Sequence, residues 1–112
     1  MSEILQQLSA TLRARRTAAP EESYVASLHH RGLNRILEKI GEEATEVVLA
    51  AKDAEQGGDR QALVGEVADL WFHSMVMLSH LDMDTADVLE CLADRFGVSG
   101  HTEKALRRPV KD

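Results

Sequence analysis

Several residue types are scarce in this chain of 112 residues, and each scarcity narrows what the protein can be. Cys91 is the single cysteine, so an intrachain disulfide is excluded and the sequence suits a reducing compartment. The first residues lack the basic start and apolar block of a signal peptide, and no apolar run approaches the roughly 20 residues that span a bilayer. We therefore expect a cytoplasmic protein that makes no membrane contact.

Basic residues are also fewer than acidic ones: the chain has 13 Lys and Arg and 19 Asp and Glu, for a net charge of -6. Non-specific nucleic-acid binding relies on a basic face that neutralises phosphates, so nucleic acid is not an expected partner. The sequence contains no GxxxxGK[ST] motif, which excludes a P-loop grip on a nucleotide. The 44% hydrophobic content, with only two prolines, indicates one folded domain over residues 1–112.

Apolar residues recur at helical spacing almost throughout, and no segment shows the sustained alternation that is typical of strands. The sequence therefore predicts an all-α fold. Five segments carry the helical pattern, at about 2–16, 23–31, 33–55, 61–80 and 84–97. The short glycine-bearing turn at 56–59 makes the two longest segments an antiparallel hairpin. The polar tail from about residue 98 follows no such pattern and receives no assignment.

The segment 33–55 carries a charged face away from its apolar stripe. Successive helical residues turn by about 100°, so one lysine and three glutamates share a single arc, namely Lys39, Glu42, Glu43 and Glu46. Taken alone, this arc is weak evidence of function, because glutamate favours helices and most acidic faces are simply solvated.

The segment 61–80 holds charged residues where its composition predicts burial. Its apolar residues surround the helix almost completely, yet Glu66, Asp69 and His73 lie on one stripe at spacings of three and four residues. A buried carboxylate is costly unless it is paired, protonated or bound to a cation. His73 either orients one of these carboxylates or is a core histidine with a satisfied hydrogen bond, and the sequence favours neither interpretation.

The hairpin places the two acidic sets level with each other. At about 1.5 Å per residue, Glu46 lies about 16 Å before the turn, and Glu66 and Asp69 lie about 12 to 16 Å after it. Facing carboxylates repel one another, and a hard divalent cation with oxygen ligands relieves that repulsion. Magnesium is the expected ion and manganese the second choice, whereas zinc is disfavoured because no cysteine or histidine set has its ligand spacing.

Magnesium often shares its coordination shell with substrate phosphates, so such a site points to phosphate chemistry. Arg35, Lys39 and Lys52 on the segment 33–55 are candidate phosphate contacts. Glu43 or Glu46 is the candidate that orients or deprotonates an attacking water. For each basic residue, a solvated or ion-paired position on the surface is the competing interpretation.

The motif EExxE at residues 42–46, followed after nineteen residues by ExxD at 66–69, resembles the all-α MazG-like nucleotide pyrophosphohydrolases. Four segments in order narrow the resemblance to the phosphoribosyl-ATP pyrophosphohydrolase family. They are SYVASL at 23–28, KIGEEATEVVLAAK at 39–52, EVADLWFH at 66–73 and RFGVSGHTEKALR at 95–107.

This resemblance implies hydrolysis of phosphoribosyl-ATP to phosphoribosyl-AMP and pyrophosphate, the second step of histidine biosynthesis, by a magnesium-dependent homodimer. The metal ligands that it implies are Glu42, Glu43, Glu46, Glu66 and Asp69. Lys39 and His73 belong to the family's pattern as well and are expected substrate contacts. Arg95, which begins the last matching segment, is a further expected substrate contact.

Two other functions stay open at this point. A house-cleaning nucleoside triphosphate pyrophosphohydrolase would use the same acidic site on a non-standard nucleotide. A non-catalytic helical dimerisation module would instead pair its acidic residues with Lys and Arg. In every case a helix that is apolar on all sides needs more neighbours than this chain offers, which predicts a MazG-like helical hairpin or bundle completed by dimerisation.

Overall fold

The computed structural model describes residues 2–97, which form five α-helices and no strand. The helices are α1 (Ser2–Arg15), α2 (Tyr24–Arg31), α3 (Leu33–Glu55), α4 (Arg60–His80) and α5 (Thr85–Phe96). The predicted all-α class is confirmed, and each predicted segment corresponds to one helix. The predicted polar tail lies outside the described residues. None of the described helices combines the length and the apolar character that crossing a bilayer requires.

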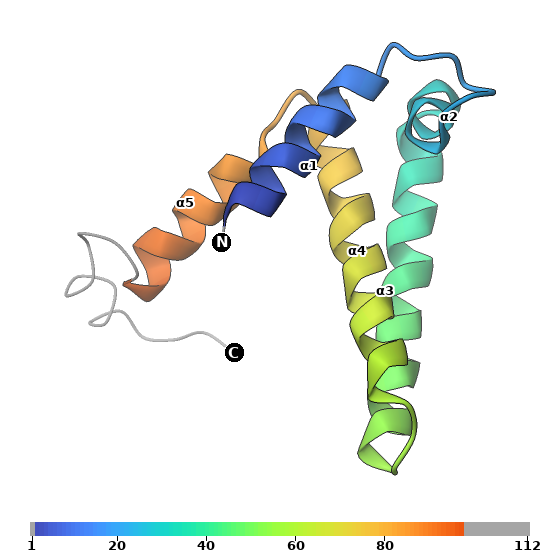
Figure 1. Ribbon diagram of the computed structural model, residues 1–112, viewed down its shortest axis with the longest axis vertical. Coiled ribbons are helices and arrows are strands. Elements are labelled where there is room, and N and C mark those ends of the chain that lie inside the picture. The colour runs from blue at the N-terminus through green and yellow to red at the C-terminus, as the bar shows by residue number, and fades with distance from the viewer. Residues whose placement is uncertain (1, 98–112) are drawn as a thin grey trace.

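The helices form two arms, as Figure 1 shows. In one arm, α3 and α4 pack against each other as the predicted antiparallel hairpin. In the other, α5 packs against α1, and α1 crosses the C-terminal part of α4. The short helix α2 packs on α3 and α1. The turn that joins α3 to α4 projects away from α1 and α5, so the two hairpin helices are each other's main neighbours at that end (Figure 1).

The apolar core lies where α1, α2, α3 and α4 meet. Its buried members are Leu12, Val25, Leu28, Ile36, Met75 and Val76. Isolated helices of these lengths are marginal in water, so burial of such side chains supplies most of the stability. The core fixes the start of α3 to the end of α4 and leaves the middle of the hairpin free to carry polar groups.

The turn between α3 and α4 sets the register of the hairpin. Gly57 has φ +96°, a left-handed conformation that favours glycine. A Cβ at Gly58 would collide with the side chain and carbonyl oxygen of Asp53, so glycine is the residue that fits here. Asp59 then caps α4, because its carboxylate accepts a hydrogen bond from the backbone N–H of Gln61 at 2.9 Å. The connection is thus short, and the N–H groups of Gln56, Gly57 and Gly58 donate to carbonyl oxygens at the end of α3.

The segment 61–80, whose burial the sequence predicts to be completed by dimerisation, is only partly buried by the described residues of the single chain. In α4 only His73, Met75 and Val76 are buried, whereas Val64 and Trp71 are 57% and 59% exposed. The physical reason is that α3 and α1 cover only part of the circumference of α4. Residues 2–97 therefore leave a large apolar surface of the hairpin uncovered.

Candidate metal centre

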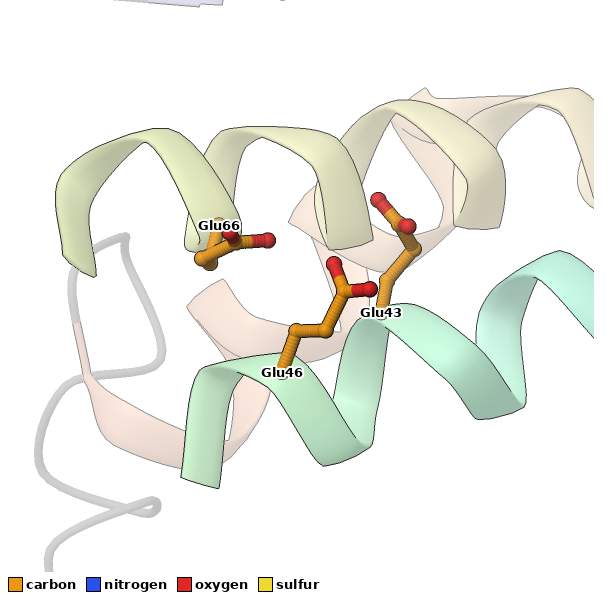
Figure 2. Close-up of side chains that lie close together, drawn as sticks. All are labelled: Glu43, Glu46 and Glu66. Atoms are coloured by element: carbon orange, nitrogen blue, oxygen red, sulfur yellow. The ribbon is translucent and has the colours of Figure 1, made fainter. Parts of the chain in front are cut away.

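Three glutamates from the two hairpin helices converge on one point. Glu43 and Glu46 come from adjacent turns of α3, and Glu66 faces them from α4 (Figure 2). One carboxylate oxygen from each residue lies within 4.8 Å of the other two. The sequence predicts that acidic residues of the two helices lie opposite each other across the hairpin, and these three do so.

The cluster carries negative charge that no ion pair within the described part of the chain neutralises. Within residues 2–97, neither lysine nor arginine forms an ion pair with Glu43, Glu46 or Glu66. A hydrogen bond between the carboxyl groups of Glu46 and Glu66 raises the pKa of Glu66, as do burial and the negative charges of Glu46, Asp69 and Glu43. Without a cation, proton sharing between Glu46 and Glu66 is therefore favoured.

An unpartnered oxygen strengthens the case for a cation. Oε1 of Glu66 is buried and has no hydrogen-bond partner among the described residues. Buried polar atoms are normally satisfied, and such exceptions occur where an ion or water belongs. Three carboxylates are hard oxygen donors of the kind that magnesium and manganese prefer, so the donor set fits a divalent cation.

His73 connects the cluster to the packed interior of the hairpin. It is 6% exposed, and its Nδ1 lies 2.9 Å from the backbone carbonyl oxygen of Asp69 and 3.8 Å from Oε1 of Glu43. A carbonyl oxygen can only accept, so Nδ1 carries the proton. Nε2 lies 2.7 Å from the hydroxyl of Tyr24 and, in the neutral ring, accepts from it. The buried His73 is thus hydrogen-bonded at both ring nitrogens and lies beside Glu43.

Tyr24 was given no role from the sequence, although it lies in the SYVASL segment. Ser23 caps α2 by accepting a hydrogen bond from the N–H of Ala26 at 3.2 Å, which fixes the first residue of the helix. The Tyr24 ring stacks on Phe72, with centroids 6.3 Å apart, and meets His73 edge-on. The only sequence signal for this contact was the family segment itself, because nothing in the spacing links residues 24 and 73.

Glu42 lies on the same helix as the cluster but has other partners. Its carboxylate lies 3.4 Å from Nζ of Lys39 and 3.9 Å from a guanidinium nitrogen of Arg35. Burial opposes the charge on Lys39, but the hydrogen bond to Glu42 and the negative charges nearby outweigh it and raise the pKa of Lys39. Lys39 is therefore firmly cationic next to the acidic cluster.

The remaining predicted site residues are placed differently. Asp69 lies one turn after Glu66 and contributes to its electrostatics, but it is exposed, so its expected burial is wrong. Lys52 pairs with Glu55 on its own helix at 3.2 Å, and both side chains are 70% exposed. Arg95 is exposed on α5, in the other arm of the molecule (Figure 1). The structure does not bring Lys52 or Arg95 to the three glutamates.

A helical hairpin with facing carboxylates that suit a divalent cation defines an all-α protein with a candidate metal centre. Comparison of the sequence with models of known protein families identifies a family. The model of the phosphoribosyl-ATP pyrophosphohydrolase family matches residues 5–96, and the chain belongs to this family of hydrolases in histidine biosynthesis. The resemblance seen in the sequence and the predicted enzyme class are thereby confirmed. The matched range runs from α1 to the end of α5 and contains every predicted site residue.

Proposed function

We propose that this protein hydrolyses phosphoribosyl-ATP to phosphoribosyl-AMP and pyrophosphate, with magnesium as its cofactor. The observation that carries the proposal is the uncompensated cluster of Glu43, Glu46 and Glu66 on the hairpin of a chain that belongs to this family. Water adds across the anhydride between the α- and β-phosphates, its oxygen bonds to phosphorus, and pyrophosphate leaves.

Glu43, Glu46 and Glu66 are the residues that would hold magnesium, with manganese as a possible substitute. Asp69 and Glu42 complete the predicted ligand set, and both lie next to the cluster in sequence. A bound magnesium ion supplies positive charge to the triphosphate oxygens as charge develops on the leaving pyrophosphate. The orphaned Oε1 of Glu66 supports this assignment, because it lacks any other partner among the described residues.

One glutamate of the cluster would also handle the water proton. Glu43 and Glu46 are the candidates, since a carboxylate within hydrogen-bond reach of the water can orient it and accept its proton. The two differ in surroundings: Glu43 is buried beside His73, and Glu46 is exposed and bonded to Glu66. Exposure favours Glu46 as the group that exchanges its proton with solvent after each turnover.

Arg35 and Lys39 are the cations best placed to bind phosphate. Both form ion pairs with Glu42, the residue before Glu43, and Nε of Arg35 is buried without a hydrogen-bond partner among residues 2–97. An arginine or lysine beside a metal centre contributes charge and hydrogen bonds to a triphosphate. Phosphate contacts from Lys52, Arg95 and His73 remain predictions that come from the sequence and the family resemblance.

A homodimer is also part of the proposal. Val48 and Leu49 on α3 and Val64 and Trp71 on α4 are each more than half exposed. Large apolar patches on an isolated chain mark surfaces that another protein covers. The partner that the family resemblance implies is a second copy of the chain. A cytoplasmic location likewise remains a prediction from the sequence.

The test is pyrophosphate release by the purified protein from phosphoribosyl-ATP, with and without magnesium, beside a panel of ordinary and modified nucleoside triphosphates. Magnesium-dependent release with a strong preference for phosphoribosyl-ATP supports the proposal. Preference for a modified nucleotide would favour the house-cleaning alternative. If no triphosphate were hydrolysed, both pyrophosphohydrolase functions would be contradicted. The non-catalytic dimerisation module would then be the remaining function.

A further inference from the structure

We propose that Tyr24 is a positioning residue of this enzyme, which acts through His73 to hold Glu43 in place for cation binding and hydrolysis. The inference rests on the proposed function, because Glu43 is one of the residues proposed there to hold the cation. Tyr24 itself lies outside the acidic cluster. The three residues link three helices, because Tyr24 begins α2, His73 lies in α4 and Glu43 lies in α3.

The hydrogen bonds run in one direction from Tyr24 to the cluster. The hydroxyl of Tyr24 lies 2.7 Å from Nε2 of His73, and Nδ1 lies 2.9 Å from the carbonyl oxygen of Asp69. Because Nδ1 donates to that carbonyl, Nε2 of the neutral ring accepts from the tyrosine O–H. The N–H bond then lies on the side of the ring that faces Oε1 of Glu43, 3.8 Å away.

Removing the hydroxyl would loosen this arrangement without emptying the core. His73 is 6% exposed, so its Nε2 would lose its tyrosine partner inside a nearly closed site. The ring would then be held by the Nδ1–H bond to the Asp69 carbonyl alone and could tilt about it, so the N–H would no longer be fixed beside Glu43. Tyr24 is 52% exposed and its ring keeps its stack on Phe72, so loss of one oxygen leaves the packing intact.

The local fold does not need this hydroxyl. Helix α2 is anchored by the Ser23 cap and by the buried residues Val25, Ala26 and Leu28. Ser27 offers a matched control on the same helix, because the one hydrogen bond of its hydroxyl within residues 2–97 goes to the backbone carbonyl of Tyr24, at 2.7 Å. Y24F and S27A each delete one oxygen from α2, but only Y24F removes the contact with His73.

The experiment compares wild type, Y24F and S27A by calorimetric titration with Mn²⁺ and by steady-state kinetics on phosphoribosyl-ATP. We expect Y24F to lower the affinity for Mn²⁺ about tenfold and to lower kcat about tenfold. Losses of this size are typical when a group that orients a metal ligand is removed. KM for the nucleotide should change much less, and S27A should match wild type. Without metal, S27A should melt with wild type, and Y24F should melt at most a few degrees lower because one buried ring nitrogen loses its partner.

A double-mutant cycle tests whether Tyr24 acts through His73. If it does, Y24F adds no further loss of Mn²⁺ affinity or kcat in an H73N background. Equal multiplicative losses in both backgrounds would overturn the inference, and so would wild-type Mn²⁺ affinity in Y24F. The Mn²⁺ titration needs no substrate, so it decides the inference even where phosphoribosyl-ATP proves not to be hydrolysed. Should H73N fail to fold, the long-range ¹H–¹⁵N spectrum of the His73 ring replaces it, and an unchanged Nε2 signal in Y24F would refute the contact.

Discussion

Oε1 of Glu43 lies 3.8 Å from Nδ1 of His73, and both side chains are more than nine-tenths buried. The pair lies at the border between two regions of the hairpin. On one side the apolar residues Ile36, Met75 and Val76 hold α3 and α4 together. On the other side Glu46 and Glu66 face each other. The packed core thus positions the first carboxylate of the acidic cluster.

Amide substitution within the cluster should abolish turnover. We expect E43Q, E46Q and E66Q each to lower kcat for pyrophosphate release by at least about 100-fold, since each loses a charged ligand or a proton acceptor. E55Q is the matched control, because Glu55 is an exposed glutamate of α3 whose one ion pair among the described residues is with Lys52. A near-normal rate in any cluster variant would remove that residue from the mechanism.

Magnesium should stabilise the folded protein. A ligand that binds only the folded state raises the melting temperature with its concentration, and here it also relieves repulsion among Glu43, Glu46 and Glu66. E66Q should melt at a higher temperature than wild type without metal and should respond little to magnesium. Thermal melts across a magnesium series check this. Equal magnesium responses of E66Q and wild type would place the ion elsewhere.

Loss of the cation at Lys39 should weaken substrate binding more than the chemical step. We expect K39Q to raise KM for the triphosphate about tenfold, which corresponds to one charge-assisted contact. R15Q removes a positive charge from exposed α1 and serves as the control. If K39Q changed kcat alone, Lys39 would act in the chemical step and not in binding.

The exposed apolar surface of the hairpin should mediate self-association. A charge at Trp71, which is 59% exposed in the single chain, should split the homodimer, because a buried unpaired charge is strongly unfavourable at an interface. Sedimentation of W71E against wild type measures this directly. E55Q is again a suitable control for a surface change on the same hairpin. Persistence of a W71E dimer would place the interface on another face.

The cap of α5 predicts a pH-dependent contribution to stability. The hydrogen bond from the N–H of Ala86 lowers the pKa of Asp84, helped by Arg13 and Ser9 and opposed by burial. A lowered folded-state pKa means that the stabilisation is present above the ordinary value of 3.8 and is lost as the pH falls through the lower folded value. D84A should therefore melt a few degrees below wild type at neutral pH. This gap should shrink in acid, and a gap independent of pH would show that the charge of Asp84 contributes nothing.

The sequence was sufficient to predict the helices and the hairpin, because both follow from local patterns. Gly57, Gly58 and Asp59 marked the turn, and the turn set Glu46 opposite Glu66. Contacts between distant segments were beyond local patterns, since residues 24 and 73 meet only through the packing of α2 on the hairpin. Burial was misjudged for Asp69 because composition does not say how many neighbours a helix has.

The short turn at 56–59 also bears on how the chain folds. Glu46 and Glu66 are joined through a hairpin with a four-residue connection, whereas the ion pair of Arg13 with Asp84 spans 71 residues. Contacts between near neighbours in sequence form first, because they close small loops. We therefore expect the like charges to meet early, before α5 docks on α1. A divalent cation present during refolding should thus accelerate formation of the hairpin as well as stabilise the finished fold.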